Sequence, residues 1–180
     1  EGNDFPVEKT WWHLLLDETN SKLVQNNSWS GTTICNTGYD GDCSKTHSFI
    51  FRLSQLVDKG FFEENEIDRV FVFGGTNDAW TGNTLGEPIY ENWTEEDKKL
   101  ILPGISFFIS ELIKVVGKDK VHVIINSIFG PNLKKGFLEI CEHYGVSYTA
   151  LTDIDMGAAQ GHPNLHGMEQ IKEQVLANLK

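Results

Sequence analysis

The sequence predicts a three-layer α/β/α domain, in which helices cover both faces of a parallel sheet. Apolar runs of strand length alternate with segments of helical periodicity, and polar, Gly-rich loops follow several of the runs. Strands that alternate with helices form parallel sheets, because a right-handed crossover returns the chain to the same edge. We expect the chain of 180 residues to form one such domain over residues 1–180.

The first half of the chain is expected to contain two helices and two strands. Apolar side chains that recur every three to four residues indicate a helix, and a short apolar run indicates a strand. By these criteria we expect a helix at 7–19, a strand at 22–26, a Gly-rich loop at 31–46, a helix at 47–58 and a strand at 69–73.

The second half continues the alternation after a loop without periodicity at 79–93. Thr94 is a suitable N-cap for a long helix that reaches about residue 116, and Pro103 is expected to kink or break that helix. The remaining expected elements are a strand at 121–126, a helix at 132–144, a strand at 146–151 and a final helix at 165–179.

The composition limits the partners of the protein. Its 15 Lys and Arg residues against 26 Asp and Glu residues give a formal charge of -11. Nucleic acids are bound through clustered cations, so we expect no nucleic-acid partner, whereas neutral and cationic substrates remain open. No apolar run approaches the roughly 18 residues of a membrane helix, so we expect no membrane span. The oligomeric state is left open.

The cysteines and the first residue give information on the cellular location of the protein. Cys35 and Cys43 share one loop and could pair under oxidising conditions, but three free thiols, with Cys141, fit the odd count equally well. The chain opens on Glu1 instead of Met, so we expect residues to precede it in the reading frame. A secreted, periplasmic or cell-surface location is expected, with the cytoplasm as the alternative.

Three polar segments mark a candidate site. Gly74-Gly75-Thr76-Asn77-Asp78 follows the strand at 69–73, the segment 26–32 follows the expected strand at 22–26, and the segment 161–167 precedes the last helix. Open α/β sheets present their chemistry at the carboxyl ends of strands. Taken singly, Gly31 fits a loop glycine and Asn77 a turn residue, but the spacing of all three segments favours a catalytic role.

Together these segments resemble the SGNH (GDSL-like) hydrolase family, and the resemblance spans nearly the whole chain. In that family a Gly after the second strand and the Asn of a Gly-x-Asn-Asp loop donate hydrogen bonds to an oxyanion, and a His before the last helix, commonly in His-Pro, is the base. The resemblance implies these roles for Gly31, Asn77 and His162. His166 is the competing base, and the His-Pro match favours His162. Neither a metal nor a cofactor is expected.

The acid that would orient the base departs from the family pattern. That pattern is Asp-x-x-His, and Ala159 stands three positions before His162. Asp155 and Asp153 lie further upstream, and the small residues between them and His162 could let one of them fold back onto the imidazole. We favour Asp155, with a backbone carbonyl in a catalytic dyad as the alternative.

The nucleophile of the family is absent from the place where it is expected. Its first block is a strand that ends in Gly-Asp-Ser and precedes the first helix, but residues 1–10 contain no Ser. In the flavodoxin-like order 2-1-3-4-5 this strand is central, between the strands expected at 22–26 and 69–73. Its loss would leave buried backbone groups unpaired, at about 1 to 3 kcal/mol each. We therefore expect an upstream segment or a separate peptide to supply both strand and Ser.

The resemblance implies a serine ester hydrolase, with a small acyl ester such as an acetylated carbohydrate as substrate. Trp80, Tyr90 and Trp93 lie in or next to the loop after Asn77 and could stack on a sugar ring, or form a small hydrophobic cluster instead. The alternative function is a non-catalytic carbohydrate-binding or interaction protein on the same fold. A nucleotide or flavin binder is disfavoured because no phosphate-binding Gly-rich loop precedes a helix.

Overall fold

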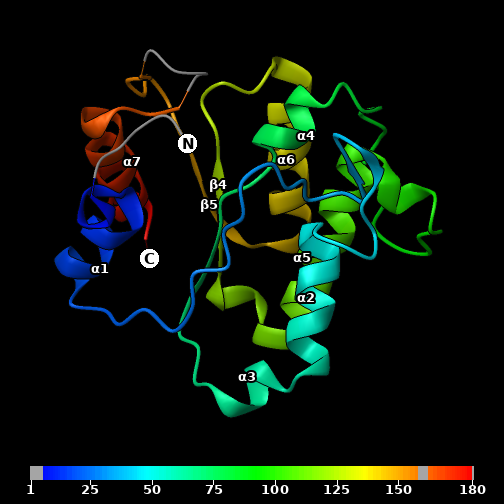
Figure 1. Cartoon of the computed structure of the whole chain (residues 1–180), viewed down its shortest axis with the longest axis horizontal. Coiled ribbons are helices and arrows are strands. Elements are labelled where there is room, and N and C mark those ends of the chain that lie inside the picture. Colours follow the sequence, from blue (N-terminus) through cyan, green and yellow to red (C-terminus); the bar gives the residue numbers. More distant parts are fainter. Residues whose placement is uncertain (1–5, 158–161, 180) are drawn as a thin grey trace.

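A parallel sheet lies between two layers of helices in the computed structural model, which describes residues 6–157 and 162–179 (Figure 1). The α-helices are α1 (Trp11–Thr19), α2 (Phe49–Asp58), α3 (Phe61–Glu64), α4 (Thr76–Trp80), α5 (Ile101–Val116), α6 (Pro131–Tyr144) and α7 (Leu165–Asn178). The strands are β1 (Thr37–Gly38), β2 (Gly41–Asp42), β3 (Val70–Val72), β4 (Val121–Ile125) and β5 (Ser147–Ala150). Short 3₁₀ helices lie at Val7–Lys9, Asp97–Lys99 and Lys118–Lys120.

Strands β3, β4 and β5 form the central sheet in that spatial order, and all run parallel. Val70 of β3 lies opposite Val121 of β4, and His122 of β4 lies opposite Ser147 of β5. The middle strand β4 is buried along its whole length, as expected for a parallel strand with helices on both faces. The predicted α/β/α architecture is confirmed, and the strand order is that of the last three strands of a flavodoxin-like sheet.

Each face of the sheet packs against its own helices. Helices α2, α5 and α6 cover one face, where Val121, Val123 and Ile125 of β4 join the larger core cluster. Helices α1 and α7 pack on each other and cover the opposite face, where Ile124 joins a second cluster with Leu15 of α1. Figure 1 shows these two groups of helices on either side of the strands. The alternation of side chains along β4 therefore divides the core into two parts.

The prediction of a strand at 22–26 is wrong. This segment forms no strand in the structure, and Leu23 and Val24 are 42% and 46% exposed. Strand β3 pairs with β4 along one edge, and within the described residues no strand pairs with its other edge. A strand needs a neighbour to satisfy its backbone groups and to cover its apolar side chains. The central strand that would serve both 22–26 and β3 is not present among the described residues.

The long helix expected from 94 to 116 starts only at Ile101, with Leu100 instead of Thr94 as its N-cap, and the break falls three residues before Pro103. A 3₁₀ turn ends at Lys99, and α5 starts at Ile101 with Pro103 in its first turn. Proline suits this position because the N–H groups of a first turn have no intrahelical acceptor. None of the described helices, α5 included, is long and apolar enough to cross a membrane.

The three cysteines are free, buried thiols. Cys35 and Cys43 flank the small hairpin of β1 and β2 within the Gly-rich loop, and Cys141 is a buried residue of α6 in the core. Burial raises the pKa of all three thiols. They are therefore poor nucleophiles in the folded protein, because the reactive thiolate is suppressed.

Gly75 joins β3 to α4 in a backbone conformation that favours glycine. Its φ is 94°, and an added Cβ would lie 2.8 Å from the ring of Phe137 and 3.0 Å from that of Phe129. We expect Gly75→Ala to lower the free energy of unfolding by about 2 to 4 kcal/mol, because strain and overpacking act together. The matched control Gly82→Ala, with φ of 71° and nothing within 4 Å, should cost only about 1 kcal/mol. Denaturant unfolding measures both values, and equal losses would contradict the packing argument.

His122 is fully buried in β4 between two hydroxyl groups. Its Nδ1 lies 2.9 Å from Ser147 Oγ and its Nε2 lies 2.8 Å from Thr149 Oγ1. Ser147 donates its own proton to the carbonyl of Val121, so Nδ1 must carry the proton and Nε2 must accept from Thr149. Burial, with a smaller contribution from the charge of Arg69, lowers the pKa of His122 to about 4. The imidazole is thus neutral in the folded protein at neutral pH.

The stability of the protein should therefore fall in acid because of His122. The folded pKa of about 4 lies below the ordinary value of 6.5, so unfolding takes up a proton between these values. The stabilising contribution of neutral His122 is fully present above pH 6.5 and is lost as the pH falls through about 4. The loss in the free energy of unfolding amounts to about 3 kcal/mol. Denaturant unfolding at several pH values should give a steeper dependence for the wild type than for His122→Gln. Identical pH dependences would show that His122 is not the titrating group.

Candidate active site

The candidate site lies at the carboxyl edge of the sheet, where β3 passes through Gly74 and Gly75 into the short helix α4. Asn77 and Asp78 are the second and third residues of α4, and both contact the loop 31–35. Asn126, which follows β4, donates from Nδ2 to Thr76 Oγ1 at 3.0 Å. The ends of two neighbouring strands are thereby tied to the helix that carries Asn77.

Asn77 is held by two hydrogen bonds that fix the orientation of its amide. Its Nδ2 donates to the carbonyl oxygen of Thr32 at 2.9 Å, and its Oδ1 accepts from the hydroxyl of Tyr39 at 3.1 Å. A carbonyl can only accept, so the nitrogen must face Thr32. The second N–H of Nδ2 makes no hydrogen bond to a described residue. Asn77 thus presents one available donor from a fixed side chain.

Asp78 braces the same loop from the next position of α4. Its carboxylate is fully buried and accepts from the N–H of Ile34 at 2.9 Å and from the N–H of Cys35 at 3.0 Å. Burial raises the pKa of Asp78, whereas these backbone donors stabilise its charged form. Asp78 therefore acts as a positioning residue for the backbone that follows Gly31.

Gly31 offers a backbone donor beside Asn77. Its φ is 75°, and its N–H donates to no other described residue. Thr32, the next residue, is the one whose carbonyl accepts from Asn77, and its hydroxyl donates to the carbonyl of Trp29 at 2.9 Å. The two donors that the sequence predicts are therefore brought into neighbouring positions through Thr32.

His162 lies on the same side of the molecule as α4. Its imidazole is exposed and contacts the indole of Trp80, with ring centroids 6.1 Å apart and planes at 85°. Trp80 stands three residues after Asn77, about one helical turn along α4. No described residue forms a hydrogen bond with the imidazole. The exposed ring thus lies beside the helix that carries Asn77.

Asp155, the proposed acid, contacts His166 instead of His162. Its Oδ2 lies 3.9 Å from Nε2 of His166, and both side chains are more than half exposed. The backbone of 155–157 nevertheless runs antiparallel to 162–164, since Met156 pairs with Pro163 and Asn164 donates to the carbonyl of Asp155. The acid segment is therefore adjacent to the base, but the carboxylate is not on its ring. Ala159 lies outside the described residues.

Of the three aromatic residues proposed to stack on a sugar, the structure places only Trp80 at this site. Tyr90 stacks on His143 with centroids 3.7 Å apart, in the last turn of α6, near the amino end of β5. Trp93 packs edge-on against Phe107 and donates from Nε1 to the carbonyl of Ile89. Tyr90 and Trp93 thus each pack against other aromatic side chains.

Two residues of the site escaped the sequence analysis. Tyr39 lies in the Gly-rich loop and orients the amide of Asn77, and Arg52 of α2 donates from Nη2 to the hydroxyl of Thr32 at 3.3 Å. Neither has a local sequence signal, because each contact joins segments more than 15 residues apart. The one sequence feature that could have indicated a role for Arg52 is its position as a cation on the otherwise apolar face of α2.

The family assignment rests on comparison with known proteins. The family described as GDSL-like Lipase/Acylhydrolase matches residues 2–179. The chain belongs to this family. Membership supports an ester hydrolase, and it agrees with the α/β/α fold and with the three sequence segments that converge at α4.

Solved structures agree with the assignment. A protein from Bacteroides ovatus ATCC 8483, described as a GDSL-like lipase, is 37% identical, with a TM-score of 0.87 over 98% of this chain and 81% of its own. A second GDSL-like lipase structure, from Bacteroides uniformis ATCC 8492, is 35% identical, with a TM-score of 0.86 over 98% of this chain and 78% of its own. No curated protein matches the chain.

Proposed function

We propose that this GDSL-like family member is a serine ester hydrolase that removes a small acyl group, such as acetyl, from a carbohydrate. The observation that carries the proposal is the convergence at α4. Asn77 donates one N–H to Thr32, its second N–H and the N–H of Gly31 bond to no described residue, and His162 lies beside Trp80. Two donors and a base in neighbouring positions are what acyl transfer by a Ser requires.

In the proposed reaction a Ser hydroxyl attacks the ester carbonyl while His162 takes its proton. The oxygen that becomes negative accepts hydrogen bonds from Gly31 N–H and from Nδ2 of Asn77. The tetrahedral intermediate collapses, the C–O bond to the alcohol breaks, and His162 returns the proton to the leaving alkoxide. Water, deprotonated by His162, then attacks the acyl-enzyme and releases the carboxylic acid and the free Ser.

The proposed nucleophile comes from a strand that is not among the described residues. The open edge of β3 and the exposed side chains of Leu23 and Val24 support a strand between them. In a flavodoxin-like sheet a strand at this place ends at the carboxyl edge, next to the loops of Gly31 and Asn77. Both solved relatives are longer than this chain, which covers 81% and 78% of them.

Asp155 remains the proposed orienting acid. Its segment runs beside His162, and its carboxylate is exposed and held only by the 3.9 Å contact with His166 among the described residues. If a backbone carbonyl orients the imidazole instead, Asp155→Asn will leave kcat/KM unchanged, and the enzyme works as a dyad.

The substrate class is tested by hydrolysis assays on the natural full-length protein. We expect release of acetate from an acetylated oligosaccharide and from p-nitrophenyl acetate, with a rate that falls as the acyl chain lengthens. Trp80, which is 43% exposed beside His162, is expected to pack on the sugar, so Trp80→Ala should raise KM more than it lowers kcat. Binding of the oligosaccharide without any release of acetate would favour the non-catalytic binding protein.

A further inference from the structure

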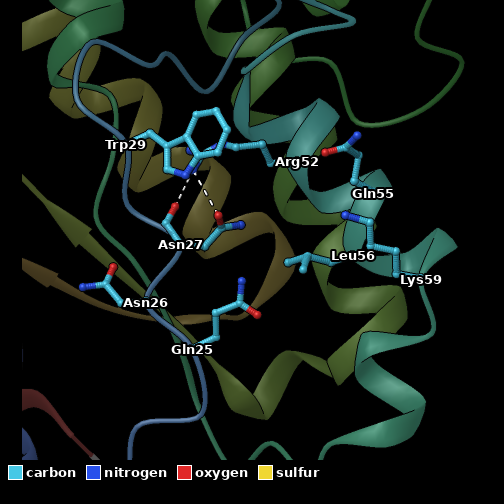
Figure 2. A pocket seen from close by; sticks show the side chains of 8 residues that line it. All are labelled: Gln25, Asn26, Asn27, Trp29, Arg52, Gln55, Leu56 and Lys59. Carbon is cyan, nitrogen blue, oxygen red and sulfur yellow. Dashed lines mark hydrogen bonds between the residues drawn. The ribbon is translucent and has the colours of Figure 1, made fainter.

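A second feature next to the candidate site is a pocket of about 260 Å³ between residues 25–29 and helix α2 (Figure 2). Arg52 and Lys59 come from α2, and Trp29 forms part of the opposite side. Every residue that lines the pocket is neutral or cationic, although the whole chain carries a formal charge of -11. The pocket is therefore positively charged, although the protein as a whole is negatively charged.

Arg52 carries a buried charge that forms an ion pair with no carboxylate of the described residues. The residue is only 5% exposed, and its guanidinium donates to neutral acceptors, the carbonyl and side-chain oxygens of Asn27 and the hydroxyl of Thr32. Its buried Nε has no hydrogen-bond partner in the part of the chain that the structure describes. The guanidinium also packs on the rings of Trp29 and Phe49, at 5.4 and 4.7 Å from their centroids. Burying an unpaired charge is costly, so an anion in the pocket would stabilise it.

Lys59 adds a second positive charge to the same pocket. It is exposed at the end of α2, and among the described residues no carboxylate forms an ion pair with Lys59 or with Arg52. An exposed lysine alone would say little. Its place beside a buried arginine without a counter-charge gives the pocket two cations and no anion.

Most of the neutral residues of the pocket are carboxamides or aromatic, which are side-chain types suited to a sugar. Four of them are carboxamides, which donate and accept hydrogen bonds as sugar hydroxyls require: Gln25, Asn26, Asn27 and Gln55. The indole of Trp29 is 58% exposed and offers a flat apolar face. We propose that the pocket binds the carboxylate and ring of an acidic sugar. It would select ester substrates that carry a uronic-acid unit.

Thr32 connects this pocket to the candidate site. Its hydroxyl accepts from Arg52, and its carbonyl accepts from Asn77, so the cation and the oxyanion donor hold the same residue from two sides. A uronic-acid unit in the pocket would place a neighbouring unit of the chain near Gly31 and Asn77. Selection of substrates rests on the proposed function, whereas binding of the acidic sugar does not.

Calorimetric titration of the natural full-length protein with glucuronate and with glucose tests the pocket directly. We expect glucuronate to bind at least about 10-fold more tightly than glucose, and we expect added salt to weaken the binding of glucuronate. Lys59→Gln should weaken glucuronate about three- to fivefold, and Arg52→Gln about 10-fold or more if that variant folds. The control Lys118→Gln removes the same charge outside the pocket and should change nothing.

Two further outcomes separate this proposal from the proposed function. Glucuronate binding that Lys59→Gln weakens, in a protein that hydrolyses no ester, would support the pocket and count against the hydrolase. Ester hydrolysis by a protein that binds glucuronate and glucose equally would support the hydrolase and overturn the pocket. Equal effects of Lys59→Gln and Lys118→Gln would also overturn it. If both activities are present, the ratio of kcat/KM for an acetylated uronic acid to that for an acetylated neutral sugar should fall in Lys59→Gln.

Discussion

Replacement of His162 by Ala is expected to lower kcat/KM for an acetyl ester at least about 1000-fold in the natural full-length protein. The exposed imidazole, which contacts Trp80 about one turn of α4 after Asn77, takes the proton of the nucleophile in the proposed mechanism. Without it the Ser stays protonated at neutral pH and is a weak nucleophile. Steady-state kinetics with p-nitrophenyl acetate measure the loss.

His166→Ala is the matched control for this prediction. His166 lies four residues further on, is also exposed, and contacts Asp155 and Glu169 instead of Trp80. We expect its loss to change kcat/KM less than about fivefold, in line with an exposed ion pair. A larger loss in His166→Ala than in His162→Ala would transfer the role of base to His166, and with it the pairing to Asp155.

Replacement of Asn77 by Ala is expected to lower kcat about 100- to 1000-fold, with little change in KM. The spare N–H of Nδ2 is used only when the substrate oxygen becomes negative, so its removal affects the transition state more than the bound substrate. Part of the loss will come from the loop, because Asn77 also holds the carbonyl of Thr32. Pre-steady-state measurement of acyl-enzyme formation isolates the chemical step.

Tyr39→Phe separates orientation of the amide from donation by it. This variant removes the hydroxyl that donates to Oδ1 of Asn77 at 3.1 Å and leaves the Thr32 contact in place. We expect a loss in kcat below about 10-fold, the cost of one neutral hydrogen bond. If Asn77→Ala lost no more activity than Tyr39→Phe, Asn77 would be a structural residue and not an oxyanion donor.

The sequence was sufficient for the elements whose signal is local. The apolar runs of β3, β4 and β5, the division of the 94–116 helix near Pro103, and the turn chemistry of Gly75 with Asn77 all depend on residues close together in the chain. The parallel sheet followed from the alternation of strands and helices. The location of Asn77 at the carboxyl edge followed from that topology.

The features that escaped prediction depend on distant partners. Residues 22–26 have the composition of a strand, but a strand forms only against a neighbour, and none of the described residues supplies one. Tyr90 was assigned to the site by its loop, whereas His143 and Tyr144 of α6 fix its position. Arg52 is charged, yet it is buried against Asn27 and Thr32, which lie more than 15 residues away. Propensity and spacing contain no information on such contacts.

The central claim is that a nucleophilic Ser completes the site, and covalent labelling tests this claim most directly. The natural full-length protein is treated with a fluorophosphonate, digested, and analysed by mass spectrometry to locate the adduct. The account predicts a single adduct on a Ser in a segment that precedes these 180 residues, and no adduct in His162→Ala. Labelling of a Ser within the chain, or no labelling of a protein that still hydrolyses esters, would contradict it.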